Sequence, residues 1–512
     1  MVAAAQSSLF CAFFVNKKPS AATGADLRMI IDCRPANRAF KEAPNTVLAS
    51  PESLATLEVD ESDTLFTSTV DVRDCFYRIR IPLEFAEYFA LPPVDASDIK
   101  SCSSRCSGRV FPCVSVLPMG FSWSLWIAQE INRSKVVESG LAASAEVNAH
   151  SQENTFVHHP LRFVVYVDNI AICGRDKKLV DAAMEKVIVV LNSCGLLTHE
   201  HTVAEPDCKL LGLQIDGRRK EICMTGKRYW RIKWAIEWVL RKKNVKGRIL
   251  ERIIGHYTVA ALLNRNALSA THTIYKLCRT HYDTPAHLWY SVRRELEAML
   301  GLLSTLRVSL VRRWQPEVYA ADACESGYGV VIADMPLSFV SEHGRVPERS
   351  RFRMQKGGKS AREHAARSAQ SNFRDWKHDL STVCAPEAED DCPDDWAVVK
   401  DFPEIDRDAV EATKWAVVCS RQYHYHEAIH MKEARAMNWC VRRMTKNCKS
   451  HSSRRLLLCD NMSVVLAFER RRAHNCSLLK QVRLFFSIGH GVKCFIKYQV
   501  DNVRVEPFRS AK

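Results

Sequence analysis

The chain has 512 residues, of which 47% are hydrophobic and 26% charged, and its formal net charge is +15 at pH 7. This composition excludes a long disordered chain, and the length accommodates roughly three to four packed units. The positive charge favours a polyanionic partner, because Lys and Arg side chains release counterions when they bind phosphates. Twenty scattered cysteines predict buried, reduced thiols of an intracellular protein, in the cytoplasm or the nucleus, since disulfide scaffolds concentrate theirs in shorter sequences.

The first 223 residues alternate short β-rich runs with helical stretches, which predicts an α/β or α+β domain. The β-rich runs are 28–32, 67–72, 163–172 and 210–215. The apolar residues 1–15 are followed, not preceded, by basic residues, so they do not resemble a signal peptide. No stretch approaches the roughly 20 apolar residues of a membrane span, and we expect no membrane partner.

Residues 226–264 predict two helices, and residues 226–252 carry ten Lys or Arg against two acids, a net of +8. Such a pair is either a solvated helical face or a basic surface that lies along a nucleic-acid duplex. Residues 281–315 predict a helical connector, and a second α/β unit begins at Val318. A polar stretch near 335–420 interrupts this unit and is interpreted as an insertion or a loop.

Two acidic motifs in the first half of the chain predict a metal site. Residues 163–172 form two hydrophobic runs around a polar tip, which predicts a β-hairpin with Tyr166, Asp168 and Asn169 at its turn. Residues 67–72 predict a strand that carries Asp71. Aspartates on adjacent strands would bind two divalent cations, which activate a 3′-hydroxyl and stabilise leaving pyrophosphate. Each aspartate alone is uninformative, since strand ends often carry a solvated Asp.

The order of these and three further motifs resembles that of reverse transcriptases. The further motifs are Lys17-Lys18 with residues 28–37, residues 117–121 (Leu-Pro-Met-Gly-Phe) and residues 210–212 (Leu-Leu-Gly). The resemblance implies that Asp71 and Asp168 are catalytic metal ligands and that the Phe76 ring excludes a ribose 2′-hydroxyl. It implies a set of residues that bind the incoming deoxynucleoside triphosphate: Lys18, Arg28, Asp74, Phe76, Met119 and Gly120. Asn169 departs from the family, which has a second Asp there; Asn keeps an oxygen acceptor but removes a charge.

Three acids in the second half resemble the motifs of ribonuclease H. Asp322 lies in a strand–glycine turn–strand pattern, Glu433 opens a predicted helix, and Asp460 ends a predicted strand. By this resemblance the three are catalytic metal ligands, with Glu506 as a fourth catalytic acid and Asp501 as its alternative. Clustered acids holding two Mg²⁺ ions activate water against an RNA phosphodiester.

One competing motif falls in the same region. Residues 426–430 spell H-E-x-x-H, which on a helix would be a zinc-protease site. We expect residues 423–431 to be a strand leading to Glu433. In a strand, the two histidine side chains would not point toward a common metal ion. Surface or paired histidines are the preferred interpretation.

Together the resemblances imply an α+β chain, a right-hand polymerase followed by an α/β ribonuclease H-like domain. Its parts would be fingers and palm (1–223), a basic helical thumb (224–280), a connector (281–315) and the ribonuclease H-like domain (316–512). The expected function is that of an RNA-directed DNA polymerase with ribonuclease H activity, with two Mg²⁺ per active site and Mn²⁺ as the alternative ion. The expected partners are the RNA template, the DNA primer, the RNA–DNA hybrid and the dNTPs.

The motifs also suggest a lineage for the chain and leave two alternative functions open. The Asp460-Asn461 pair resembles the corresponding motif of DIRS or VIPER-like tyrosine-recombinase retrotransposons. The abrupt start of the sequence predicts that the chain is a fragment of a polyprotein, whose other domains would be further partners. The alternative function is that of a decayed or domesticated copy that binds nucleic acid without catalysis, which Asn169 motivates. A polymerase that copies RNA into RNA is a third option, disfavoured by Phe76.

Overall fold

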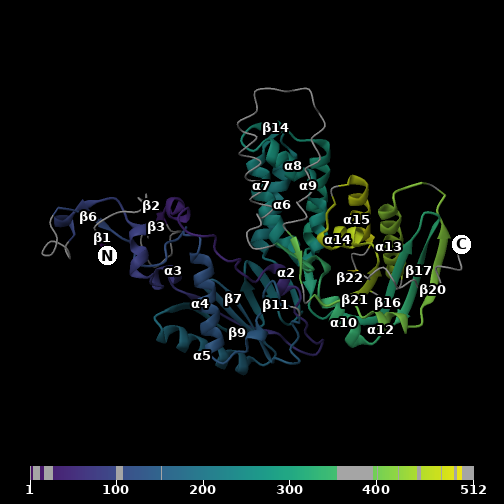
Figure 1. Cartoon of the computed structure of the whole chain (residues 1–512), viewed down its shortest axis with the longest axis horizontal. Helices are drawn as coiled ribbons and strands as arrows, with labels where there is room; N and C mark the ends of the chain where they lie inside the picture. The colour runs from purple at the N-terminus through teal and green to yellow at the C-terminus, as the bar shows by residue number, and fades with distance from the viewer. Residues whose placement is uncertain are drawn as a thin grey trace. The chain divides into compact units, whose positions relative to one another are not determined.

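The computed structural model describes residues 2–3, 12–16, 27–99, 108–151, 153–354, 396–399, 402–424, 426–446, 451–473, 475–488 and 493–498. The chain divides into two compact units, residues 1–221 and residues 222–512, whose elements are labelled in Figure 1. Every described cysteine is a free thiol, as predicted. Among the described helices, none combines the length and the apolar character that a membrane span requires.

The first unit is built on a four-stranded antiparallel sheet of order β7-β8-β4-β9. Its strands are β4 (Phe66–Val72), β7 (Leu161–Tyr166), β8 (Asn169–Gly174) and β9 (Thr198–Glu205). The helices α4 (Ser124–Glu138) and α5 (Lys177–Ser193) pack against it (Figure 1). This arrangement confirms the predicted strand at 67–72 and the predicted hairpin at 163–172.

Helix α5 shows how the sequence produces this packing. The Asp176 carboxylate caps its N-terminus by accepting the backbone N–H of Lys178 at 2.8 Å. Its buried residues Val180, Met184, Val187 and Leu191 recur every three or four positions, so they form one apolar stripe. The stripe joins the apolar face of the sheet in a single core.

Smaller elements complete the first unit. They are β1 (Val2–Ala3), β2 (Ala12–Asn16), β3 (Leu27–Ile31), α1 (Arg34–Asn37), α2 (Pro51–Leu54), α3 (Cys75–Arg78), η1 (Leu83–Phe89), β5 (Val94–Asp95), η2 (Ala96–Asp98), β6 (Arg109–Pro112), η3 (Ala143–Ala145), β10 (Asp207–Leu210) and β11 (Leu213–Asp216). Strands β2 and β3 form an antiparallel pair in which Val15 lies opposite Arg28. Strands β10 and β11 form a hairpin whose turn is Leu211-Gly212, both with positive φ, so the expected 210–212 motif contains a turn.

The second unit begins with a helical part. Its elements are β12 (Glu221–Met224), α6 (Gly226–Leu240), β13 (Asn244–Lys246), α7 (Gly247–Ala261), η4 (Leu262–Ala270), α8 (Thr273–Thr280), β14 (Pro285–His287), α9 (Tyr290–Leu302), η5 (Leu303–Thr305) and β15 (Arg307–Ser309). The two helices predicted over 226–264 are confirmed as α6 and α7. Ile232, Ile236 and Val239 form the buried stripe of α6.

The C-terminal part of the second unit is a five-stranded mixed sheet of order β20-β17-β16-β21-β22. Its elements are β16 (Arg313–Ala323), β17 (Gly327–Asp334), α10 (Leu337–Arg345), η6 (Glu348–Ser350), β18 (Phe352–Met354), β19 (Trp396–Val398), α12 (Arg407–Glu411), β20 (Ala416–Gln422), α13 (Ile429–Thr445), β21 (Ser453–Cys459), α14 (Met462–Arg470), α15 (Cys476–Ile488) and β22 (Lys493–Tyr498). Strands β16, β21 and β22 run parallel, whereas β17 and β20 are antiparallel additions.

Two predictions for this part were wrong. The stretch 335–420 is not an insertion throughout, because its described ends form α10, α12 and most of the edge strand β20. The polar composition reflects exposed positions on an edge strand and on short helices that cover the sheet. The strand expected over 423–431 is also absent, since β20 ends at Gln422 and α13 begins at Ile429.

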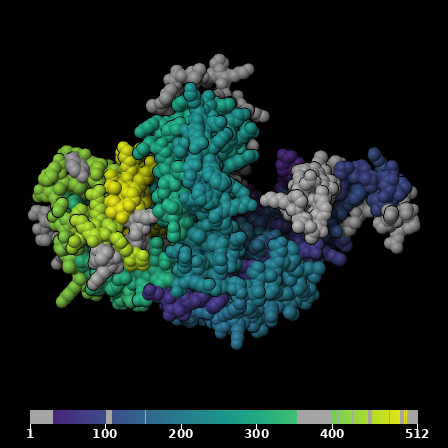
Figure 2. Space-filling view, turned by 180° about the vertical axis from the view of Figure 1, so that it is seen from behind, coloured from purple at the N-terminus to yellow at the C-terminus, as the bar shows by residue number. Residues whose placement is uncertain are grey.

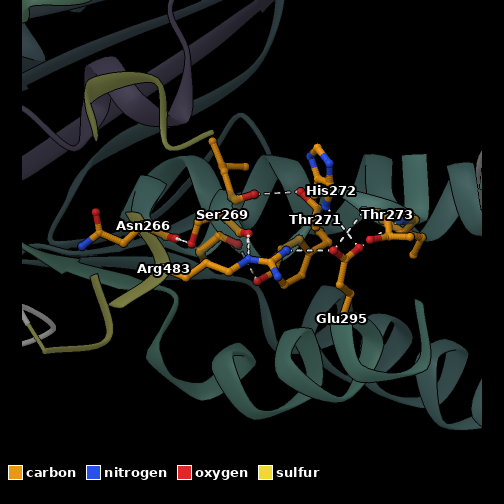
Figure 3. A network of polar contacts seen from close by, with 11 residues as sticks. Asn266, Ser269, Thr271, His272, Thr273, Glu295 and Arg483 are labelled. Carbon is orange, nitrogen blue, oxygen red and sulfur yellow. Dashed lines mark hydrogen bonds and ion pairs between the residues drawn. The ribbon is translucent and has the colours of Figure 1, made fainter. Parts of the chain in front are cut away.

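A partly buried ion pair joins the two parts of the second unit (Figure 3). Arg483 of α15 donates to Glu295 of α9 at 2.8 Å and to the Ser269 carbonyl at 2.8 Å. The Glu295 carboxylate, 4% exposed, also accepts the backbone N–H groups of residues 272–274 at the start of α8. Figure 2 shows the yellow surface of α15 directly beside the teal helical part. The helical part and the mixed sheet are therefore packed together.

Candidate active sites

Asp71 and Asp168 come together although 97 positions separate them in the sequence. Asp71 lies opposite Asn169 in the β4–β8 ladder, and the backbone N–H of Val72 donates to the Asp168 carbonyl at 2.8 Å. Burial, and next the negative charge of Asp168, raise the pKa of Asp71 to about 6. Two carboxylates whose mutual repulsion opposes ionisation form the oxygen donor set that divalent cations bind. These residues fit the expected metal ions.

The hairpin turn that carries Asp168 is strained and is held by α4. Val167 has φ of 57°, a left-handed conformation that is rare for a β-branched residue. The Gln129 amide donates to the Val165 carbonyl at 3.0 Å and accepts the Val167 N–H at 2.8 Å. Asn132, one helical turn further, donates to the Val167 carbonyl at 2.7 Å. Both amides are fully buried, so they fix the backbone that presents the carboxylate.

Sequence reasoning missed Gln129 and Asn132. Their spacing of three places them on one face of α4, and two amides on a buried helix face need partners. That pattern was the available signal. The partners themselves belong to a segment more than 30 positions away, which the pattern does not identify.

His199 is a second residue to which the sequence assigned no role. It lies opposite Asp71 in the β4–β9 ladder, with its Nδ1 atom 3.4 Å from the Asp71 carboxylate and 3.1 Å from its carbonyl oxygen. The electrostatic interaction with His199 lowers the pKa of Asp71, although less than burial and Asp168 raise it. Histidine at this position therefore partly compensates the repulsion between the two acids.

Asn169 modifies the same carboxylate pair. Its side chain is exposed, and its Nδ2 group donates to Asp168 Oδ1 at 3.1 Å. It pairs with Tyr166, which is 37% exposed, to close the hairpin. The amide thus gives Asp168 a hydrogen-bond donor without adding a negative charge.

Some residues expected to bind the triphosphate lie in the same unit. Asp74, with φ of 51°, precedes α3, and the half-buried Phe76 of that helix packs on the core that contains the sheet. Met119 is half-buried and Gly120 has φ of 109°. Arg28 lies in β3, but its side chain, like the whole of Lys18, lies outside the described residues.

Gly120 occupies a position that accommodates no other residue easily. A Cβ atom there would lie 3.1 Å from the Ile31 carbonyl oxygen, and the positive φ disfavours side chains as well. Asn37 fixes this turn, because its amide donates to the Gly120 carbonyl at 3.0 Å and accepts the Ser122 N–H at 2.9 Å. Asn37 was part of the sequence motif but had no assigned role.

Asp322, Glu433 and Asp460 also converge, in the second unit. Strands β16 and β21 run parallel with Ala321 opposite Cys459, so Asp322 and Asp460 follow at the same end of the sheet. The Asp322 carboxyl hydrogen-bonds with Asp460, and burial raises its pKa. Burial, and then the charges of Asp460 and Asp322, raise the pKa of Glu433 to about 9.

This cluster also fits a divalent cation. Among the described residues, the buried Glu433 Oε2 atom has no hydrogen-bond partner, which is costly unless a proton or a cation is nearby. Ligand atoms of Glu433, Cys459 and Asp460 lie within 4.8 Å of one another. Burial keeps the Cys459 thiol protonated by raising its pKa well above the ordinary value, so the carboxylates are the suitable ligands.

Three remaining predictions concern the neighbourhood of this cluster. Glu433 does not open its helix but lies one turn inside α13. His426 precedes the helix and His430 lies in its first turn, so the H-E-x-x-H residues do not share a helix. Glu506 and its alternative Asp501 lie outside the described residues.

Comparison with known proteins finds similarity to one family in the first half of the chain. Residues 15–215 match the profile of the family described as reverse transcriptase (RNA-dependent DNA polymerase). A comparison with curated proteins gave no match. A foamy viral protease-reverse transcriptase in complex with RNA/DNA hybrid is similar at 13% identity and a TM-score of 0.41, over 99% of this chain and 73% of that chain. A structure of the foamy viral protease-reverse transcriptase in complex with dsDNA is similar at 13% identity and a TM-score of 0.42. The similarity covers 96% of this chain and 80% of that chain. Residues 15–215, which contain both Asp71 and Asp168, are therefore similar to the reverse-transcriptase family.

Proposed function

We propose that the chain copies RNA into DNA and degrades the RNA of the resulting hybrid. The observation that carries the proposal is that acids far apart in the sequence converge twice, Asp71 with Asp168 and Asp322 with Glu433 and Asp460. Each set combines burial with mutual repulsion, which a pair of Mg²⁺ or Mn²⁺ ions would relieve. The domain limits at 223, 280 and 315 and the dNTP-binding roles of residues 18, 28, 74, 76, 119 and 120 belong to the same proposal.

At the polymerase site, bound metal ions would activate the primer 3′-hydroxyl and stabilise the leaving pyrophosphate. Asp71 and Asp168 would hold the ions, while the Gln129 and Asn132 amides keep the hairpin backbone in place. Phe76 would lie against the sugar of the incoming nucleotide, where its ring leaves no room for a 2′-hydroxyl. In the second cluster, Asp322, Glu433 and Asp460 would hold the ions that direct water to an RNA phosphodiester.

Helix α6 offers a surface suited to the duplex. Its side opposite the buried stripe exposes Trp230, Trp234 and Trp238 by 48%, 61% and 48%. Lys233 Nζ lies 5.7 Å from the ring of Trp230, and Lys242 Nζ lies 4.9 Å from that of Trp238. Rings interleaved with cations bind both sugars or bases and phosphates. This surface supports the thumb assignment.

Primer extension on an RNA template and cleavage of a hybrid, both with Mg²⁺, test the proposal together. Asp71→Asn should abolish extension and leave RNA cleavage intact, whereas Asp460→Asn should do the reverse, so each variant controls for the folding of the other. If the wild type neither extends nor cleaves, and Asp71→Asn binds the hybrid as tightly as the wild type, the chain is a non-catalytic binder. Asn169 is the observation that favours this second candidate.

We also propose a DIRS or VIPER-like lineage, on the Asp460-Asn461 pair. The Asn461 side chain accepts the Val464 N–H at 3.2 Å and so caps α14. Capping gives Asn461 a structural reason to be present in any lineage. Sequencing the genomic neighbourhood tests the proposal, because a tyrosine-recombinase reading frame should accompany the element, and an integrase frame would contradict it.

A further inference from the structure

A cavity of about 390 Å³ lies on the C-terminal part of the second unit. It is lined by β17, by the end of β20 and the residues after it, and by α13 and α15. None of Asp322, Glu433 and Asp460 lines it. The α13 residues that do so begin after Glu433 and continue to Arg442, about two turns along the helix. The cavity is therefore separate from the carboxylate cluster.

The lining carries an excess of positive charge. Arg421, Arg435 and Arg442 line the cavity, and no acidic residue does. Arg435 is paired with Glu427 at 2.7 Å. Arg421 and Arg442 have no acidic partner within the part of the chain that the structure describes, and both are exposed. Two guanidinium groups at the mouth of a cavity favour a phosphate group as the ligand.

Aromatic rings form another part of the lining. Tyr328 and Tyr423 have ring centroids 5.1 Å apart with an interplanar angle of 32°. The Tyr423 hydroxyl donates to the Lys432 carbonyl at 2.8 Å, which holds the ring in place. Trp439 of α13 is half-buried and adds a third ring. Fixed rings beside arginines suit a planar, π-bearing group attached to a phosphate.

Asn438 supplies the most specific feature of the cavity. Its side chain is 4% exposed, and its Nδ2 group donates to the carbonyl oxygen of Gln481 at 3.2 Å and to the Oε1 atom at 2.9 Å. Because both partner atoms only accept, the amide orientation is determined. The buried Oδ1 atom has no hydrogen-bond partner among the described residues. It requires an N–H donor, which a phosphate does not provide.

We propose that this cavity binds one unpaired nucleotide of a single-stranded nucleic acid. The base lies against Tyr328, Tyr423 or Trp439, and an N–H group on its edge donates to Asn438 Oδ1. The phosphate lies at Arg421 and Arg442. An acidic peptide would satisfy the arginines but leave the rings unused, so the combination of cations, rings and one acceptor favours a nucleotide. The site is independent of catalysis at either carboxylate cluster.

Cross-linking tests where the strand binds. A ten-nucleotide single strand that carries one 5-iododeoxyuridine is irradiated with the full chain, without divalent ions or dNTPs, and the products are mapped by mass spectrometry. We expect cross-links at Trp439, Tyr423 or Tyr328. Cross-links confined to residues outside the cavity would overturn the proposal. Because the assay needs no turnover, a chain that fails in primer extension can still pass it.

Binding measurements test the chemistry of the ligand. The probe is a fluorescein-labelled strand of ten deoxyadenosines, followed by anisotropy. The double variant Arg421→Gln/Arg442→Gln should bind about tenfold more weakly, and the slope of log affinity against log salt should fall by about 1.4, for two lost phosphate contacts. The control Arg472→Gln/Lys480→Gln removes two exposed charges from the same domain outside the cavity and should bind within about twofold of the wild type.

Competition and one further variant separate the alternatives. Asn438→Leu, which replaces the amide by an apolar side chain of similar size and so removes the acceptor, should weaken binding about tenfold while circular dichroism stays unchanged. An abasic strand that competes as well as the deoxyadenosine strand would reduce the site to phosphate binding and contradict the proposal. A decaglutamate that competes equally well would instead identify an acidic peptide. Equal affinity of the two double variants would also overturn the proposal.

Discussion

The side-chain amide of Gln129 bridges the backbone of Val167, two residues from its other contact at Val165, and so holds a strained turn in one conformation. A β-branched residue in the left-handed region costs about 1–3 kcal/mol and persists only where the surroundings impose it. The residue that follows is Asp168, so the strain lies directly beside the proposed metal ligand. The position of the Asp168 carboxylate therefore depends on helix α4, which lies outside the sheet.

Gln129→Leu should therefore reduce the turnover of primer extension more than it changes the KM for dNTP. The substitution leaves a buried carbonyl and a buried N–H without partners, which also costs about 2–3 kcal/mol of stability. Steady-state kinetics with Mg²⁺, at a temperature where circular dichroism shows a folded protein, provide the measurement. Ser134→Ala, at an exposed position of the same helix, is the control. An unchanged turnover would show that the turn does not need the amide.

Glu433→Gln should make the protein more stable at neutral pH in metal-free buffer and abolish RNA cleavage. The pKa of Glu433 is raised from 4.5 in the unfolded chain to about 9 in the fold. The folded protein therefore retains a proton that the unfolded chain loses, and the stability of the wild type falls as pH rises through this window. The stability of the variant lacks this pH dependence. Its free energy of unfolding should therefore exceed that of the wild type only slightly at pH 5 and by more than about 1 kcal/mol at pH 8.

Urea unfolding at the two pH values, followed by circular dichroism, measures this difference for the transition of the second unit. The control is Glu342→Gln, which neutralises an exposed acid on α10. Added Mg²⁺ should stabilise the wild type and release protons, because a cation takes the place of the proton on the cluster. Equal stability of wild type and Glu433→Gln at pH 8 would contradict the electrostatic account.

Asn169→Asp should lower the Mg²⁺ concentration needed for half-maximal extension by about three- to tenfold. A third carboxylate beside Asp71 and Asp168 strengthens the attraction for the ions, and it replaces an amide that now donates to Asp168. Without Mg²⁺ the added repulsion should lower the unfolding temperature. Asn244→Asp, an exposed substitution far along the sequence, should change neither quantity. A rise in the Mg²⁺ requirement would reject this role for position 169.

Gly120→Ala should destabilise the first unit by about 1–3 kcal/mol and raise the KM for dNTP. The added Cβ meets the Ile31 carbonyl at 3.1 Å and displaces the turn that Asn37 holds. Gly140→Ala is a matched control, because Gly140 has nearly the same φ, 104°, but no atom within 4 Å of the added Cβ. Denaturation and kinetics of both variants separate backbone strain from the close contact. Identical effects of the two substitutions would exclude the contact as the cause.

The sequence predicted the elements whose residues alternate or recur regularly. The strand at 67–72, the hairpin around Asp168 and the helices α6 and α7 were all predicted, because apolar periodicity directly determines which face is buried. The meeting of Asp71 with Asp168 was expected from the order of motifs. The partners that hold the turn, Gln129 and Asn132, depend on tertiary contacts that no local pattern specifies.

The errors have the same physical origin. β20 was assigned to an insertion because an exposed edge strand carries polar residues and resembles a loop. The residues before Glu433 were expected to be a strand because aromatic residues alternate there, yet Ile429 and Met431 lie in the first turn of α13. The Trp residues of α6 are apolar in composition, yet they are exposed to solvent. In each case the structure depends on tertiary packing, which the composition of the segment does not specify.

The ion pair between Glu295 and Arg483 has a practical consequence for anyone who produces this protein in pieces. A cut near residue 316 would separate the sheet from the helices and leave the Glu295 carboxylate, 4% exposed in the intact chain, without its cation. Loss of the cation leaves a buried carboxylate without a compensating charge, which is destabilising. The helices and the sheet of the second unit should thus be produced on one fragment, because a fragment that contains only one of them should be less stable.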